Sequence, residues 1–281
     1  MTFVIKKVSD HGTSNPIVAR MAVQTHEVIQ FFNLDKERRD QVLDIYINQV
    51  KPRLLSCMEI ADAVRQEAEE IEARILRNDL GEQAGGRAIE LPQIARLIER
   101  VEIYLYNAKS ALRDLALTFE PLFGVSFTHS RYNEILAWTV KNFGTEAPLA
   151  SFLSDDEPWI RRIVNMRNAI EHPGGKQGRL HILNFELIKE DARGRFFQGP
   201  VWFLEGEKPA AIAVDLQTML CNLLTFAEEL LVVAHVQLNP GTIIQFASIP
   251  EADRNPQCAI RLRAVLDESK MRPNTDSEQA R

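Results

Sequence analysis

The chain has few of the residues that build metal centres or covalent cross-links. Among its 281 residues there are three cysteines, Cys57, Cys221 and Cys258, which lie far apart in the sequence. No two have the Cys-x-x-Cys spacing of a zinc site, and an odd number does not suit a disulfide framework. We therefore expect no metal and no other cofactor, and a reducing, cytoplasmic location.

The chain also lacks a long apolar segment. Its first residues show no apolar run after the lysines, which argues against a secretory signal. The longest apolar stretch, residues 230–238, follows two glutamates and is too short for a membrane span. The net charge of −6 argues against a protein coated in nucleic acid and indicates no reader of DNA sequence, but it permits a local basic site.

Helical periodicity is what the sequence does have. Apolar residues recur at three- and four-residue steps in six segments before residue 173. Asp35 is the expected N-cap of the second segment, and Pro52 is expected in the first turn of the third or at a kink. Residues 81–90 are expected to form a loop with paired glycines. The six expected helices span residues 17–32, 36–50, 52–78, 91–124, 130–142 and 157–172.

The pattern changes to strict alternation after residue 178. Residues 179–204 are expected to form a β-hairpin, which precedes a last long amphipathic helix at 215–238. Weaker strand patterns follow at 241–250 and 258–266. The predicted fold class is therefore mainly α: a helical bundle with an inserted β-hairpin and short C-terminal strands.

We divide the chain into four parts on this basis. An N-terminal strand and helix occupy residues 1–34, with the strand at 2–9, and the helical bundle occupies residues 35–238. A short β-rich segment spans residues 239–266. The polar, proline-containing residues 267–281 are expected to be disordered.

One helix carries an arginine where an apolar residue is expected. On a helical wheel, Ile160, Ile163, Val164 and Ile170 define a buried arc, and Arg167 falls near its middle. A charge in that position must be satisfied. An ion pair with Glu171, one turn later, is the plain explanation, and an anion bound in a cleft or subunit interface is the functional one.

Other polar residues are expected beside Arg167. Asn168 and His172 are one turn apart, and Arg161 lies two turns before Asn168 on the same side. Guanidinium groups grip phosphate oxygens, and a histidine can transfer a proton near neutral pH. His172 before Pro173 and Gly174 is equally typical of a favourable charge at a helix C-terminus. Lys176 and Arg179 follow and would add positive charge or form an ordinary exposed turn.

Residues 167–172, RNAIEH, resemble the signature of the HEPN superfamily, in which an arginine is followed at a short interval by a histidine. The resemblance implies a bundle of four or more helices and covers about residues 35–238. Many members are metal-independent endoribonucleases that act as homodimers, some in defence or as toxins. It implies that Arg167 holds the scissile phosphate, that His172 transfers a proton and that Asn168 orients the phosphate or the histidine.

The resemblance leaves alternatives open. Some toxin members carry a tyrosine two positions after the histidine, where this chain has Gly174. We therefore do not expect modification at that position. Many members are non-catalytic and bind RNA, a nucleotide or a protein partner, and a helical assembly module unrelated to HEPN proteins would also fit the periodicity.

Several other motifs are expected to be structural. Residues 174–178, GGKQG, resemble a phosphate loop but follow a helix and precede a strand, which is the wrong order. His26 begins a zinc-protease pattern in which Gln30 replaces the second histidine. His129 is expected to start a helix, and His235 is expected in the core or at an interface. The spacing of three aromatic residues favours core positions over a base-stacking platform: Tyr104, Tyr106 and Trp138.

Overall fold

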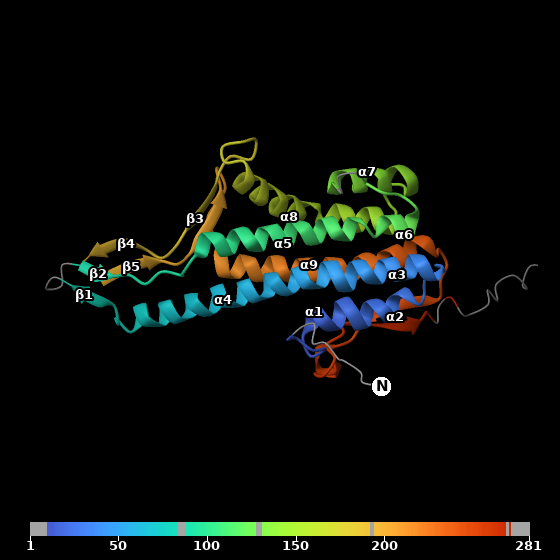
Figure 1. Cartoon of the computed structure of the whole chain (residues 1–281), viewed down its shortest axis with the longest axis horizontal. Helices are drawn as coiled ribbons and strands as arrows, with labels where there is room; N and C mark the ends of the chain where they lie inside the picture. The colour runs from blue at the N-terminus through green and yellow to red at the C-terminus, as the bar shows by residue number, and fades with distance from the viewer. Residues whose placement is uncertain (1–9, 84–87, 128–130, 192–193, 268–269, 271–281) are drawn as a thin grey trace, which may run out of the picture. The chain divides into compact units, whose positions relative to one another are not determined.

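The computed structural model describes residues 10–83, 88–127, 131–191, 194–267 and 270 (Figure 1). The described chain is mainly helical with small antiparallel sheets, as the sequence predicts. The predicted strand at 2–9, the paired glycines at 85–86, His129 and nearly all of the tail after residue 267 lie outside the described residues.

The chain folds as two compact units. Unit 1 consists of Met1–Lys51, Asp114–Asp156 and Thr225–Arg281, and unit 2 consists of Pro52–Arg113 and Glu157–Leu224. Three long helices supply residues to both units: α5 (Leu97–Ala116), α8 (Pro148–Glu171) and α9 (Ile212–Leu238).

Unit 1 confirms the helices expected near the N-terminus. The Asp35 side chain accepts a hydrogen bond from the Arg38 amide at 2.8 Å, so it caps the following helix as predicted. Farther along the chain, Gly144 ends the helix at Tyr132–Phe143 and has φ of 91°. The described helices that lie wholly in unit 1 are α1 (Pro16–Val18), η1 (Ala19–Gln24), α2 (Thr25–Ile29), α3 (Lys36–Asp44), η2 (Ile45–Val50), α6 (Phe119–Phe123), α7 (Tyr132–Phe143) and the short 3-10 helix η3 (Glu251–Asp253).

The segments η1 and η2 are π-helical, which the sequence does not reveal. η2 ends at Val50, and Pro52 is the second residue of the next helix, α4 (Lys51–Leu76). A proline lacks the backbone N–H and its ring crowds the preceding helical turn, so a widened turn here has a local cause.

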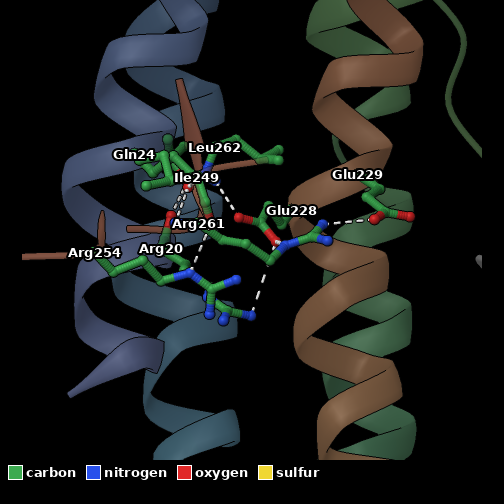
Figure 2. A network of polar contacts seen from close by, with 9 residues as sticks. Arg20, Gln24, Glu228, Glu229, Ile249, Arg254, Arg261 and Leu262 are labelled. Atoms are coloured by element: carbon green, nitrogen blue, oxygen red, sulfur yellow. Dashed lines mark hydrogen bonds and ion pairs between the residues drawn. The ribbon is translucent and has the colours of Figure 1, made fainter. Parts of the chain in front are cut away.

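Within unit 1, a buried polar network connects the C-terminal strands to the helices η1 and α9. Strands β8 (Ile244–Ser248) and β9 (Leu262–Leu266) pair antiparallel, as the weak strand patterns suggest. Figure 2 shows Gln24 of η1 facing the start of β9, where its side-chain oxygen accepts hydrogen bonds from the backbone amides of Arg261 and Leu262. The Gln24 amide donates to Glu228 of α9 at 2.5 Å.

Arg261 completes this network. Its guanidinium donates at 2.5 Å to Glu228, whose side chain is fully buried, and at 2.5 Å to Glu229, whose side chain is 38% exposed. Burial opposes the charge of Arg261, but the carboxylates of Glu229 and Glu228 outweigh it and raise the pKa of Arg261. Both oxygens of a buried carboxylate are thus satisfied, which burial of a charge requires.

The two glutamates provide a matched stability test. Glu228→Ala leaves Arg261 and Gln24 without a buried partner, so we expect it to lower the free energy of unfolding by about 3–5 kcal/mol. Glu229→Ala removes a half-exposed partner of the same guanidinium, and we expect a loss below about 1 kcal/mol. Urea denaturation of both variants measures the difference, and equal losses would contradict a structural role specific to Glu228.

His235 of α9 is a core residue of unit 1, as the sequence predicts. It is 2% exposed, and its ring lies edge-on to Phe31, Phe32 and Phe246. Its Nδ1 lies 3.3 Å from the side-chain amide nitrogen of Asn239, whereas its Nε2 is buried without a hydrogen-bond partner. Desolvation by burial lowers the pKa of His235 from its ordinary value of 6.5.

This shift has a defined effect on acid stability. Below about pH 6.5 the unfolded chain binds a proton that native His235 resists, so the free energy of unfolding falls as the pH decreases. We expect His235→Phe, which keeps an aromatic ring but cannot titrate, to lose less stability between about pH 7.5 and pH 5. Urea midpoints across that range test this, and parallel pH profiles for the variant and the natural chain would refute it.

Unit 2 is built on parts of four long helices and the strands between them. Tyr104 of α5 is fully buried and donates its hydroxyl to the Leu216 carbonyl of α9 at 2.7 Å. Gln217 of α9 donates to Asp62 of α4 at 2.9 Å. Arg100 of α5 pairs with Glu67 of α4 at 2.8 Å, so an ion pair also joins these two helices.

The predicted hairpin at 179–204 is confirmed, but it is broken in the middle. β3 (Leu180–Leu183) pairs with β6 (Val201–Leu204), and β4 (Glu186–Asp191) pairs with β5 (Gly194–Gln198). The break contains Asn184, whose side chain exchanges two hydrogen bonds with the backbone of Ile94. These bonds hold Asn184 outside the strand pairing, so the hairpin divides into two separately paired parts. Strand β7 (Ala210–Ala211) adds to β6.

Three expected boundaries were wrong. Residues 81–90, expected as a loop, contain paired strands β1 (Gly81–Gln83) and β2 (Ala88–Glu90). The expected helix at 91–124 breaks after α5, where the Thr118 hydroxyl donates to the Leu115 carbonyl. α8 begins at Pro148 rather than at 157, with Pro158 inside it. Ser154, whose carbonyl loses its partner there, is exposed to water.

The helix α9 is long and apolar enough to cross a membrane by length and composition. Its most apolar window has a mean hydropathy of 1.6, and 61% of that window is buried within the protein. Buried core helices meet the same criterion, so composition alone gives weak evidence for a span.

Candidate functional site

The buried face of α8 differs from the one that the helical wheel predicts. Ile160, Ile163, Met166 and Ala169 are the core positions, while Val164 and Ile170 are only half-buried. Arg167 therefore lies at the edge of the buried face and not at its centre. The wheel placed the arc on isoleucine and valine alone and overlooked Met166 and Ala169.

Arg167 makes the plain contact that its spacing suggests. Its guanidinium lies 3.0 Å from a carboxylate oxygen of Glu171, one turn later, and its side chain is 16% exposed. The Nε atom of Arg167 is buried without a hydrogen-bond partner. One carboxylate thus satisfies the charge of Arg167 but not all of its donors.

A second cation shares the same carboxylate. Lys109 of α5 donates to Glu171 at 3.2 Å and to the side-chain oxygen of Asn168 at 2.9 Å. We call Lys109, Arg167, Asn168 and Glu171 the Glu171 cluster. It joins α5 to the end of α8, and two of its charged side chains are accessible, since Lys109 is 37% and Glu171 35% exposed.

The aromatic side chain beside this cluster was misassigned from the sequence. Tyr106 was expected in the core with Tyr104, but it is 50% exposed. The guanidinium carbons of Arg167 and of Arg53 in α4 lie 5.8 Å and 6.0 Å from the centre of its ring. These distances are typical of cation–π contacts.

The sequence contains two indications that Tyr106 and Lys109 lie on an exposed face. The apolar stripe of the segment 91–124 runs through Tyr104, Leu105 and Ala108 and omits Tyr106. Lys109 follows Tyr106 by three residues, which places the two side chains on one face of a helix. The missing information was which helix covers that face.

His172 stands exposed where α8 ends. Its amide donates to the Asn168 carbonyl at 2.9 Å, which closes the last turn. Gly174 has φ of 76°, a left-handed conformation that glycine adopts without strain, so the predicted helix stop is confirmed. Lys176 and Arg179 are exposed on the turn that follows.

This turn is not built as a phosphate loop. The amides of Gly174, Gly175 and Gly178 all donate to backbone carbonyls at 2.9–3.0 Å. A phosphate loop needs such amides free to face the ligand. The structure thus supports the rejection of a nucleotide-triphosphate site at residues 174–178.

Arg161 is directed away from the other candidate residues of α8. Its guanidinium binds Glu157, one turn toward the start of the helix, through Nε at 2.6 Å and through a terminal nitrogen. The predicted row of Arg161, Asn168 and His172 is therefore split, because Asn168 turns toward Lys109. The neighbouring Arg162 pairs with Asp215 of α9, which also accepts from the Trp202 ring nitrogen.

A metal site, a reactive cysteine and a separate cavity have less support in the described residues. Within them, no group of three histidine, cysteine, aspartate or glutamate side chains could hold a metal ion. Burial raises the pKa of the Cys57 thiol, which disfavours the reactive thiolate. A hollow of about 660 Å³ in unit 2 is lined by parts of α4, β6 and α9 and by none of the candidate residues.

Comparison with known proteins does not assign a function, so the function must be inferred from the residues of the site. No family model, no curated protein and no solved structure matches the chain.

Glu171 provides a test of the site as an anion binder. Glu171→Gln removes the carboxylate that occupies Arg167 and Lys109, so we expect affinity for inorganic phosphate to rise by about 2- to 5-fold. Because the ion pairs are partly exposed, the free energy of unfolding should change by less than about 1 kcal/mol. Calorimetric titration and urea denaturation measure the two quantities.

The matched control lies on the same helix. Glu157→Gln removes a carboxylate from Arg161 in the same four-residue spacing, away from the Glu171 cluster. Phosphate affinity should stay at the level of the natural chain. If both variants raise it equally, the effect is one of net charge and not of this site.

Proposed function

We propose that the chain is a HEPN-like, metal-independent endoribonuclease. The observation that carries the proposal is an anion position already formed at the end of α8. There the carboxylate of Glu171 lies against Arg167 and Lys109, beside exposed His172. A phosphate group has the charge and the oxygen atoms to replace that carboxylate.

The roles follow from the chemistry of each side chain. Arg167 and Lys109 neutralise the scissile phosphate as the 2′-hydroxyl attacks phosphorus and the 5′-oxygen leaves. His172 transfers a proton in this step, and Asn168 orients the phosphate. The products are a 2′,3′-cyclic phosphate and a 5′-hydroxyl, so the proton of the 2′-hydroxyl balances the one gained by the 5′-oxygen and no water is consumed. Lys176 and Arg179 add positive charge along the path of the RNA.

The resemblance to HEPN proteins adds a second copy of the chain. In such a homodimer, two RNAIEH segments face each other across a cleft, and Arg167 and His172 of each copy act on one strand. This arrangement explains why one chain presents its histidine to solvent, since the rest of the cleft comes from its partner.

Cleavage of single-stranded RNA in EDTA tests the proposal. We expect the natural chain to produce 2′,3′-cyclic phosphate ends, and Arg167→Ala and His172→Ala each to slow cleavage by at least about 100-fold. DNA of the same sequence should stay intact because it lacks the 2′-hydroxyl. His26→Ala, which removes an exposed histidine of unit 1, should cleave normally.

Three outcomes separate the candidate functions. Cleavage that requires a divalent metal ion contradicts the proposed mechanism. Binding of RNA without cleavage under any condition supports a non-catalytic RNA-binding protein instead. If purified chain neither binds nor cleaves RNA, the site has another function and an assembly module becomes the better hypothesis.

A further inference from the structure

Tyr106 is an aromatic side chain that the fold leaves half exposed among cations. Large aromatic residues usually bury most of their surface, whereas Tyr106 is 50% exposed beside the guanidinium groups of Arg53 and Arg167. We propose that Tyr106 is a stacking platform for an unpaired nucleobase of single-stranded RNA, whose phosphate lies between Arg167 and Lys109. This assignment rests on the proposed function of the Glu171 cluster and names the part of the RNA that the site selects.

The geometry brings the base position and the phosphate position together. Tyr106 and Lys109 are three residues apart on α5 and therefore share one helical face. Arg167 contacts both parts of the site: its guanidinium lies 5.8 Å from the ring centre and 3.0 Å from Glu171. The guanidinium of Arg167 thus lies near both the ring of Tyr106 and the carboxylate that marks the phosphate position.

The surroundings of the ring favour a nucleotide. Arg53 lies 6.0 Å from the ring centre and adds a second planar cation on which a base can stack. Ile103, one turn before Tyr106, is also 50% exposed and extends the apolar part of the face. An aromatic ring within a group of positive charges is the usual construction of a single-strand binding surface.

The platform should accept any base. Asn107, a neutral amide next to Tyr106, already donates to the Ser56 hydroxyl and to the Ile103 carbonyl. Stacking uses the face of the base, which all four bases have, whereas sequence reading needs hydrogen bonds to base edges. We therefore expect binding that depends on unpaired bases but only weakly on their identity.

A fluorescent base analogue reports stacking directly. The full-length chain is titrated into a single-stranded 2′-O-methyl oligonucleotide that contains 2-aminopurine and cannot be cleaved. We expect stacking on Tyr106 to quench the fluorescence. Tyr106→Leu should abolish the quenching and weaken binding about tenfold, whereas Tyr106→Phe and Tyr106→Trp should retain both.

Salt dependence separates stacking from charge. Lys109→Ala should reduce the slope of log affinity against log salt concentration, because it removes a phosphate contact. Tyr106→Leu should lower affinity by the same factor at every salt concentration. Ile98→Ala, which truncates a 55% exposed residue two turns before Tyr106, is the control and should change neither quantity.

The outcomes distinguish this inference from the proposed function. If Arg167→Ala weakens binding and Tyr106→Leu leaves affinity and quenching unchanged, the platform is refuted while the phosphate site stands. If quenching depends on Tyr106 but RNA is not cleaved, the platform stands and the ribonuclease does not. If the natural chain binds no oligonucleotide, or binds a duplex equally well, the platform is overturned. Circular dichroism of Tyr106→Phe and Tyr106→Leu shows whether both variants are folded.

Discussion

The organisation of unit 2 around its candidate site depends on one carboxylate. Arg167 and Lys109 come from different helices, and without Glu171 their like charges would face each other across a partly buried contact. Glu171 therefore offsets this repulsion where α5 meets the end of α8. Since its side chain is 35% exposed, each of its ion pairs contributes at most about 1 kcal/mol. An incoming anion can replace it at little cost.

Unit 1 contains the opposite case. Glu228 also binds an arginine from another segment, but its side chain has no exposure, and Gln24 satisfies its second oxygen. Displacing this carboxylate would leave Arg261 with the more exposed Glu229 in place of its buried partner and Gln24 without its acceptor, at a cost of several kcal/mol. A glutamate–arginine pair thus stabilises unit 1, whereas in unit 2 the same pair forms a weaker contact that an anion could replace. The difference follows from the burial of the glutamate.

Local signals in the sequence predicted the elements but not their junctions. Asp35 and Gly174 mark helix ends correctly because capping depends on a few neighbouring residues. The break at Asn184 was missed because its cause is a pair of hydrogen bonds to Ile94, 90 residues away. Tyr106 was missed for a related reason: periodicity identifies the buried stripe of a helix but not what lies beside its exposed face.

The chain's negative charge does not oppose an anion site. At physiological ionic strength, charges on the surface are screened beyond about 8 Å, so the net charge of −6 acts weakly on a ligand held by local contacts. Lys109 and Arg167 act at contact distance, and the carboxylate of Glu171 that pairs with both is partly exposed. A site of this kind holds a phosphate by a few close contacts and gains the rest of its affinity from Tyr106, whose stacking is insensitive to charge. Such a division would favour short unpaired segments of RNA over long duplexes, because bases inside a duplex are stacked on their neighbours and have no free face to offer.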